Sequence, residues 1–493
     1  MHLGSLLTDL QQALALLPWH WMAAALHLLL APFSVLHALL YKRDPRAALG
    51  WVSVSLLFPL VGPLLYFIFG INRVQTQAQK LQPARHFKLR VGYESGNLGH
   101  QVQSHLNDEL ADELQKFTRI TDQVSAKPMI GGNHVQMLQN GEEAYPAMLA
   151  AVDAAQHYIM LATYLFEADE VGRAFVDALA AARRRGVDVY VILDGIGELY
   201  SWPRVRWRLR RAGVKVARFL PAKLLPPSVF VNLRNHRKIL VVDGLQAFTG
   251  GMNIGARHLV ERGADANTAA DVHFCISGPV VSQLQAVFAD DWSFASRHRL
   301  SLPAVTPLAT GSSDCRCISD GPNADLDKIG LVLMGAISAA RRTVVIVTPY
   351  FLPSREMIAT LQAAALRGVH VSIILPERSN LRYVDWATRN MLWQLLQYRI
   401  HVYYQPPPFA HTKLFLVDGV YAQIGSANWD ARSLRLNFEL NMEIVSSALL
   451  KRMQGYVSTI LERSRVVTLD EIMGRRLPAR IRDALFWLFT PYL

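Results

Sequence analysis

The sequence predicts an α/β protein made of two homologous halves, preceded by a hairpin of two transmembrane helices. Two observations support this prediction. The same phrase of polar and apolar residues occurs twice, beginning at His236 and at His411, and two long uncharged stretches lie near the amino terminus. One short match of this kind arises by chance often enough to be weak evidence. Two copies with identical spacing indicate a duplicated domain.

The amino-terminal region, residues 1–72, is predicted to be the transmembrane hairpin. No charged residue occurs from Leu10 to Tyr41 or from Ala47 to Ile71, and each stretch is long enough to cross a bilayer as a helix. The polar turn Lys42–Arg46 separates them. The competing interpretations are a buried helix pair and a cleaved signal peptide, but no basic residue precedes the first stretch. Gly62-Pro63 should kink the second helix.

A polar segment, residues 73–130, follows the predicted hairpin, and its sequence assigns it no role. It begins with more basic residues than the turn between the helices carries: Arg73, Lys80, Arg85, Lys88 and Arg90. Because basic residues favour the cytoplasmic side of a membrane, this cluster favours the cytoplasmic side for the following domains, although the turn also carries three basic residues and the two counts are close.

The first copy of the phrase lies in the first half, residues 131–308. His236 and Lys238 precede an apolar run, 239–242, which is followed by Asp243 and, ten residues further along, by Asn253. The run reads as a strand that ends in an Asp-Gly turn. On a strand, alternate side chains share a face, so His236 and Lys238 point the same way and Asp243 points the other way.

The second copy lies in the second half, residues 326–493. His411, Lys413, the run 414–417, Asp418 and Asn428 repeat the first copy position by position. A stretch rich in Gly, Ser and Asp, residues 309–325, reads as the linker between the halves. Other segments recur in step: 158–164 resembles 344–350, each an apolar strand ending in tyrosine, and 185–189 resembles 367–371. Alternating helices and buried strands are typical of an α/β fold.

A histidine beside a lysine suits a phosphate group. Lysine supplies charge to the non-bridging oxygens, histidine attacks phosphorus or moves a proton, and the asparagine amides add donors. The aspartates face away and are better suited to stabilising the turn. The candidate catalytic residues are those of the two phrases: His236, Lys238, Asp243, His411, Lys413 and Asp418, with Asn253 and Asn428 as phosphate-binding residues.

The paired phrase resembles the phospholipase D superfamily, and the likeness is closest to bacterial cardiolipin synthases. The resemblance covers nearly the whole chain and is carried by the segments 235–239, 425–430, 432–441 and 194–197, together with the amino-terminal hairpin. It implies two α/β/α sandwich domains related by a pseudo-twofold axis, with one active site at their seam. It also implies that Asp271 and Glu439 orient the catalytic histidines. The stretch 268–273 lacks the Trp-Arg pair that usually precedes this aspartate, and Gly251 stands where many relatives have serine.

The resemblance further implies a phosphatidyltransferase that makes cardiolipin and glycerol from two phosphatidylglycerols. His236 would form a phosphatidyl-histidine, and His411 would act as acid and then base. With two lysines and two asparagines against the phosphate, no metal or cofactor is expected. The alternatives are phospholipid hydrolysis, phosphatidylethanolamine as co-substrate, a lipid-binding scaffold without activity, and a nuclease. One chain holds both halves of the site, so oligomerisation is not required.

The expected partners are phosphatidylglycerol and anionic membrane lipids, and the expected location is the bacterial inner membrane, as a multi-pass protein. Net charge is +12, and the segment 202–223 is rich in arginine and aromatic residues, which suits lipid headgroups. Nucleic acid is the alternative partner, which the membrane spans disfavour. Residues 475–493 predict an amphipathic helix, either at the bilayer interface or packed on the second domain. Three cysteines form neither a disulfide framework nor a zinc motif.

Overall fold

The computed structural model describes residues 19–42, 45–71, 118, 120–221, 233–263, 268–302, 305, 307–321 and 327–490. The chain divides into two compact units, Met1–Leu81 and Gln82–Leu493, which are treated separately here. Most of the polar segment 73–130, with the basic residues that precede position 91, lies outside the described residues.

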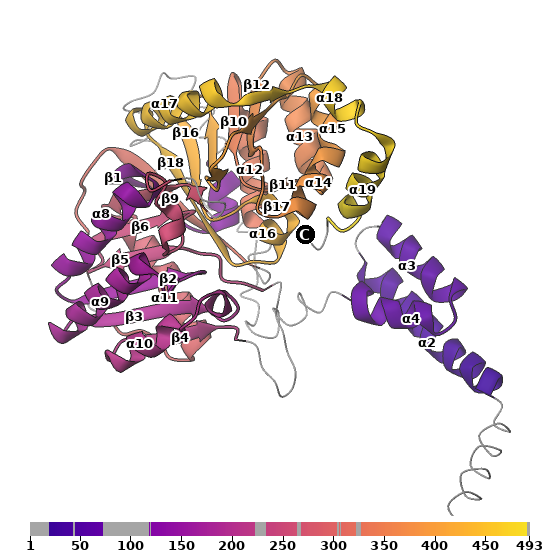
Figure 1. Ribbon diagram of the computed structural model, residues 1–493, viewed down its shortest axis with the longest axis horizontal. Helices are drawn as coiled ribbons and strands as arrows, with labels where there is room; N and C mark the ends of the chain where they lie inside the picture. The colour runs from indigo at the N-terminus through magenta and orange to yellow at the C-terminus, as the bar shows by residue number, and fades with distance from the viewer. Residues whose placement is uncertain are drawn as a thin grey trace, which may run out of the picture. The chain divides into compact units, whose positions relative to one another are not determined.

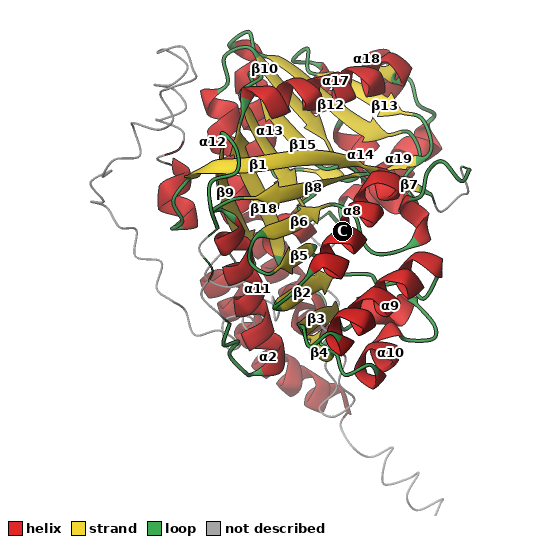
Figure 2. Cartoon of the chain, turned by 90° about the vertical axis from the view of Figure 1, so that its left-hand side faces the viewer, coloured by secondary structure: helices red, strands yellow, loops and turns green. Residues whose placement is uncertain are grey.

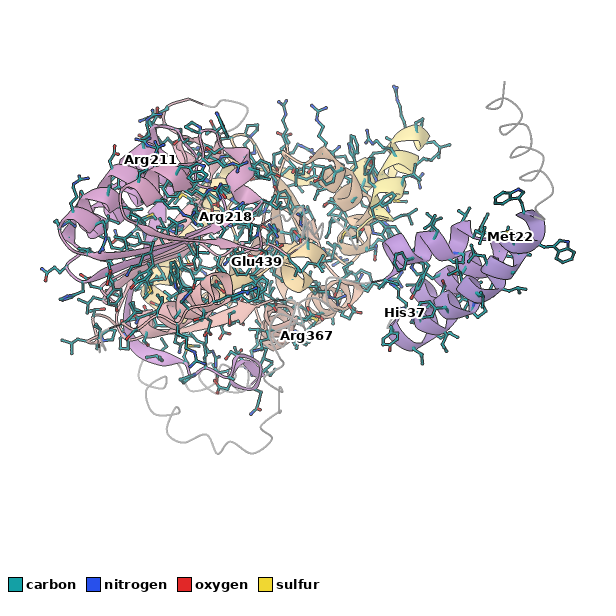
Figure 3. The ribbon with its side chains drawn as sticks, turned by 90° about the horizontal axis from the view of Figure 1, so that it is seen from below. Met22, His37, Arg211, Arg218, Arg367 and Glu439 are labelled. Atoms are coloured by element: carbon teal, nitrogen blue, oxygen red, sulfur yellow. The ribbon has the colours of Figure 1, made fainter. Side chains whose placement is uncertain are left out.

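The amino-terminal unit contains helix α2 (Trp19–Tyr41), on which Figure 3 labels Met22 and His37. Its segment Trp21–Tyr41 is long and apolar enough to cross a membrane. Three shorter elements follow and pack against it: α3 (Pro45–Leu57), α4 (Val61–Leu65) and the π-helix η1 (Tyr66–Gly70). His37 Nδ1 lies 2.7 Å from the Tyr66 hydroxyl, which joins the first of these elements to the last.

The second apolar stretch is helical but not one continuous helix, so the predicted hairpin is shown only in part. The helix breaks at residues 58–60, where Leu60 has φ +60°. Pro59 has no N–H and its ring clashes with the preceding turn, which explains why the break comes before Gly62-Pro63. Gly62 then allows a close approach, because a Cβ there would lie 2.0 Å from the Val54 carbonyl oxygen.

The second unit is built on one 15-stranded mixed sheet (Figures 1 and 2). The strands of the first half, from the outer edge to the centre, are β4 (Lys215–Phe219), β3 (Asp188–Asp194), β2 (Tyr158–Thr163), β5 (Ile239–Val242), β6 (Gln246–Gly250), β8 (Val272–Ser277) and β1 (Ile130–Gln139). Those of the second half continue from the centre as β9 (Ser313–Asp320), β18 (Glu439–Val445), β16 (Tyr421–Gly425), β15 (Leu414–Val417), β10 (Thr343–Val347), β12 (His370–Pro376), β13 (His401–Gln405) and β19 (Arg465–Val467).

The two halves are related by a pseudo-twofold axis. The strand order reads the same outward from the central antiparallel pair β1–β9, with β19 as an addition to the second half. Strands β5 and β15 have the predicted bounds. Each pairs antiparallel with the equivalent strand of its own half, β5 with β2 and β15 with β10. The predicted domain duplication is therefore confirmed.

Helices cover both faces of the sheet in each half (Figures 1 and 2). In the first half α8 (Asn140–Ala154), α9 (Glu170–Arg184) and α10 (Val205–Arg211) lie on one face and α11 (Val281–Ser296) on the other. In the second half α12 (Lys328–Ala339) and α13 (Arg355–Leu366) face α17 (Ser447–Arg463) across the sheet. Each half encloses its own apolar core, around Phe175 in the first and Leu361 in the second.

Residues 313–320 form the central strand β9, so the prediction that 309–325 is a linker is wrong. Arg316, one of the polar residues that suggested a linker, is paired with acidic side chains inside the protein. Arg316 is fully buried, and its Nε donates to Glu443 Oε2 of the neighbouring strand over 2.7 Å, while Nη1 contacts Asp122. Paired charges of this kind are tolerated in a core, whereas unpaired charges are not.

The carboxy-terminal helix α19 (Leu477–Trp487) packs on α14 (Arg382–Met391) of the second half. The rings of Phe486 and Trp386 have centroids 4.9 Å apart, and the Arg482 guanidinium lies 4.4 Å above the Trp386 ring. One of the two alternatives for this segment, packing on the second domain, is therefore observed.

Candidate active site

Each candidate catalytic histidine is held at the seam by the opposite half of the chain. His236, just before β5, donates its backbone N–H to Phe438 O over 2.9 Å. His411, just before β15, donates to Ala270 O over 2.8 Å, and the strands β7 (Ala269–Ala270) and β14 (Phe409–Ala410) pair beside it. Each histidine thus lies against the segment that carries the other half's acidic residue.

The histidines and carboxylates form crossed pairs. His236 Nδ1 lies 3.2 Å from Glu439 Oε2, and His411 Nδ1 lies 2.8 Å from Asp271 Oδ2. Both carboxylates are fully buried, whereas the histidine side chains keep 15% and 13% of their surface exposed. A carboxylate at Nδ1 fixes the tautomer with the lone pair on Nε2, the nitrogen that is then free to react. Figure 3 shows Glu439 in the interior of this unit.

The two carboxylates have different surroundings. Glu439 accepts hydrogen bonds from the Ser426 hydroxyl, from Ser433 Oγ over 2.9 Å and from Asn437 Nδ2 over 3.2 Å. Asp271 Oδ1 accepts from the Val272 N–H over 2.8 Å. Gly251 occupies the place that Ser426 has in the second half, and a Cβ on it would lie 2.4 Å from Asp271 Oδ2. The first half therefore has no room for the serine.

These surroundings shift the two carboxyl pKa values in opposite directions. Burial alone disfavours the charged form of both groups. At Glu439 the neighbouring His236 and the hydrogen bonds outweigh burial and lower the pKa, whereas at Asp271 burial prevails and raises the pKa. Burial also lowers the pKa of His236, and that of His411 further, well below its ordinary value. Both imidazoles are therefore neutral at pH 7.

The two phrase lysines are buried beside the histidines. Lys238 Nζ donates to His236 O, and Lys413 Nζ to His411 O, each over 2.6 Å. Burial lowers the pKa of Lys238 to about 7 and that of Lys413 to about 8. An arriving phosphate restores the charged form of each lysine, because an anion nearby favours the ammonium.

The two asparagines follow strands β6 and β16. Asn253 Oδ1 accepts from the Leu165 N–H over 3.1 Å, so its NH₂ is the end that can donate to a ligand. Asn428 is buried, and its Oδ1 makes no hydrogen bond to any residue in the described part of the chain.

The aspartates of the two phrases stand apart from the site, which corrects their inclusion among the catalytic candidates. Asp243 accepts from the backbone N–H groups of residues 156, 157 and 158, each over 2.8 Å. Asp418 accepts in the same way from residues 341, 342 and 343. Each lies at the far end of a four-residue strand from its lysine, and its oxygens are engaged in fixing the turn.

Two residues that sequence reasoning did not assign also shape the site. The Tyr164 ring lies edge-on to His236 with centroids 5.3 Å apart, and the repeat of strand-ending tyrosines was its only signal. His258, on η3 (Ala256–His258), accepts the Asn253 N–H at Nε2 over 3.4 Å and lies 3.2 Å from Ala269 O through Nδ1. Burial lowers its pKa to about 3, so it stays neutral. Nothing in the spacing of the chain marked it.

Asp194, the aspartate of the segment 194–197, fixes the residues that precede His236. Asp194 Oδ2 accepts from the Asn235 N–H over 3.0 Å, and Oδ1 accepts from Arg234 Nη1 over 3.1 Å. The same Oδ1 accepts the N–H groups of Ile196 and Gly197, each over 2.9 Å. One buried carboxylate therefore ties the end of β3 to the residue before His236.

Two similar α/β domains that share one site of paired histidines, lysines and carboxylates define an enzyme of the phospholipase D superfamily. Comparison with known proteins supports this assignment. The family model described as "Cardiolipin synthase, PLD-like domain" matches residues 148–292 and 333–461, and "Phospholipase_D-nuclease N-terminal" matches residues 25–70. The chain belongs to the cardiolipin synthase family.

Relatives in this family match along almost the full chain. The cardiolipin synthase of Geobacillus kaustophilus is 30% identical over 94% of this chain and 92% of its own length. Cardiolipin synthase A of Pseudomonas putida KT2440 is 31% identical over 94% of this chain and 96% of its own length. Among solved structures, the phosphatidylserine synthase of Haemophilus influenzae shares the fold, with a TM-score of 0.59 and 14% identity over 77% of this chain and 100% of that one.

Replacing Asp243 tests its structural role. Asp243→Ala leaves three backbone N–H groups without their acceptor, which should lower the free energy of unfolding by about 2–4 kcal/mol. The measurement is denaturant unfolding of the detergent-solubilised protein. Asp177→Ala is the control, because the Asp177 side chain is 73% exposed and lies 3.8 Å from Arg208. This substitution should change the free energy of unfolding by less than about 0.5 kcal/mol. A stable but inactive Asp243→Ala protein would instead return this residue to catalysis.

The lysine pKa values predict how phosphate binding depends on pH. Lys238 and Lys413 bind a phosphodiester best when protonated, and they lose their protons near pH 7 and 8 in the unliganded protein. Competitive inhibition by glycerophosphoglycerol, a monoanion throughout, should therefore weaken from about pH 6 to about pH 9. Lys451→Gln, at an exposed position, should keep this dependence, and Lys238→Gln should reduce it. An inhibition constant that stays level would contradict the assignment.

Proposed function

We propose that this chain is a membrane-anchored phosphatidyltransferase that joins two phosphatidylglycerols into cardiolipin and releases glycerol. The observation that supports it most is the crossed pair of histidine–carboxylate contacts, each beside a buried lysine. Relatives that match over 94% of the chain are named cardiolipin synthases, which supports a membrane phospholipid as substrate. Proposed catalytic residues are His236, His411, Lys238 and Lys413, with Asn253 and Asn428 on the phosphoryl oxygens.

In the first step, Nε2 of His236 attacks phosphorus and the bond from phosphorus to the glycerol headgroup oxygen breaks. As the anionic phosphodiester binds, His411 takes up a proton from solvent, because a nearby negative charge favours the imidazolium. His411 gives this proton to the glycerol oxygen, so glycerol leaves as a neutral alcohol. The lysine ammonium groups and asparagine amides take up the charge that develops on the non-bridging oxygens. The product of this step is a phosphatidyl-histidine.

In the second step, the headgroup hydroxyl of another phosphatidylglycerol attacks the same phosphorus. His411, now neutral, takes the hydroxyl proton, and the bond from phosphorus to His236 breaks. Cardiolipin forms and both histidines return to their starting state. Phosphatidylethanolamine is the alternative co-substrate, and water in place of the lipid hydroxyl would make phosphatidic acid, the phospholipase outcome.

The unequal carboxylates support His236 as the nucleophile. A histidine that carries phosphorus on Nε2 and a proton on Nδ1 is cationic, and an ionised carboxylate stabilises it. Glu439 is held ionised by three side-chain donors, and it faces His236. His411 has a strongly lowered pKa, so its protonated form is the stronger acid and suits protonation of the leaving alcohol.

The membrane arrangement is also proposed. Helix α2 spans the bacterial cytoplasmic membrane, and the broken stretch 47–71 forms the return pass, so that the catalytic unit lies on the cytoplasmic side. The apolar composition of α2 and the match of residues 25–70 to a phospholipase D amino-terminal family support membrane association. Labelling of introduced cysteines from one side of intact cells would test the arrangement.

Product analysis tests the reaction. Purified protein given labelled phosphatidylglycerol in the presence of a chelator should yield cardiolipin and glycerol. His236→Ala and His411→Ala should each lower turnover by roughly 10⁴-fold or more, since the two histidines act as one unit. Phosphatidic acid as the sole product would make the protein a phospholipase. Unchanged lipid turnover in both variants would leave only a binding role.

Trapping the intermediate tests the two histidine roles. In His411→Gln, a p-nitrophenyl phosphatidyl ester needs no acid for its leaving group, so the first step should proceed and the second should stall. Labelled phosphatidyl should then accumulate on the protein, and peptide mass spectrometry after an alkaline quench should find it on His236. His236→Gln should take up no label. Label on residue 411 in the wild type would reverse the roles.

A further inference from the structure

Three exposed, largely apolar side chains follow strand β3 of the first half. They belong to the 3-10 turn η2 (Gly197–Tyr200) and the residues after it: Leu199, Tyr200 and Trp202, the last 83% exposed. Two of the three side chains are aromatic, and we refer to the three residues together as the aromatic rim. The turn follows β3, at the edge of the sheet where the site lies. Gly197 touches the Tyr164 backbone, and Tyr164 in turn packs against His236.

The aromatic rim is held in its exposed position by buried charges. Asp194 binds the N–H groups of Ile196 and Gly197, as described above. Glu198 is buried between two arginines, with Arg206 Nε and Arg218 Nε each 2.8 Å from one of its oxygens. Two of the arginines that suggested headgroup contacts are therefore used internally, and their role is to fix the turn.

Three of the remaining arginines of this region lie on helix α10, which follows the turn. Arg208, Arg210 and Arg211 are exposed on α10, next to Trp207, which is itself half exposed. In the view of Figure 3, Arg218 lies between Arg211 and Glu439. Exposed aromatic residues and exposed arginines in one segment are the composition of a surface that meets anionic headgroups and the apolar layer beneath them.

The second half presents an apolar surface at the same level. Helix α14 follows β12 as η2 and α10 follow β3, so the pseudo-twofold axis relates these regions and they lie at equal height along it. Helix α19 packs on α14 with one face. Its other face exposes Leu477, Ile481 and Leu485, spaced four residues apart in one stripe. We refer to these three residues as the α19 stripe.

We infer that the aromatic rim and the α19 stripe together form a surface that docks the catalytic unit onto the lipid bilayer, with the active site between them. This inference rests on the proposed phosphatidyl transfer. The histidines are only slightly exposed, and every methylene withdrawn from a bilayer costs free energy. If the site itself lies against the bilayer, a phosphatidyl group reaches the histidines while its acyl chains stay in the membrane.

Lipid quenching tests the surface without requiring turnover. An environment-sensitive fluorophore is attached to Trp202→Cys and to Ile481→Cys in the full chain, reconstituted in phosphatidylglycerol vesicles that contain acyl-chain spin-labelled lipid. Leu366→Cys is the matched control, since Leu366 is 73% exposed but precedes β12 at the opposite edge. Burial raises the pKa of all three native thiols, so the introduced thiol should label first.

Emission at positions 202 and 481 should be lost on adding the spin-labelled lipid, and emission at 366 should persist. Equal quenching at all three positions, or none at 202, would overturn the docking surface. Shielding of 202 that depends on protein concentration and not on lipid would assign the surface to a second copy of the chain and would also overturn the inference.

Kinetics supply a second readout. Trp202→Ala should raise KM for phosphatidylglycerol in vesicles by about tenfold, the equivalent of 1.4 kcal/mol. The same variant should leave kcat/KM unchanged for a short-chain phosphatidylglycerol that is monomeric in water. Equal losses on both substrates would overturn the inference. A wild-type protein that makes no cardiolipin would refute the proposed function, while the quenching experiment would still decide the docking surface.

Discussion

The hydrogen bonds that cross the seam are the constraint on which the rest of the structure depends. His236 takes its backbone partner and its carboxylate from the second half, and His411 takes both from the first. Neither half can therefore assemble a working histidine alone. The continuous sheet through β1 and β9 keeps the two halves in register, so that contacts only about 3 Å long form on both sides at once.

The seam is polar, and its charges are matched locally. Arg237 lies beneath His236 and donates to the Glu439 carbonyl over 3.0 Å while contacting Asp291. In the middle of the sheet, Arg316 donates to the Glu443 carboxylate. Buried ion pairs of this kind add little net stability. Removing one partner lowers the stability strongly, because the other is left as an unpaired, unsolvated charge. They therefore disfavour any alternative packing of the two halves.

Sequence reasoning located the catalytic strands and both histidines because their signals are local and repeated. The bounds of β5 and β15 follow directly from apolar runs that end in Asp-Gly. Sequence reasoning failed where a charged side chain is paired with a residue far away in the sequence. Residues 313–320 looked like a linker because Arg316 finds its acids on other elements, Glu443 being over a hundred residues away. The crossing of acids between halves was equally hidden, because a twofold relation does not reveal which half supplies which partner.

Joining both halves in one chain has a consequence for how the site can diverge. Two identical chains around a twofold axis would need the same residue at both Gly251 and Ser426. Here one position excludes a side chain and the other supplies a donor to Glu439. A substitution can thus improve one histidine as an attacking group without imposing the same change on its counterpart. Covalent linkage lets a symmetric scaffold carry an asymmetric division of labour.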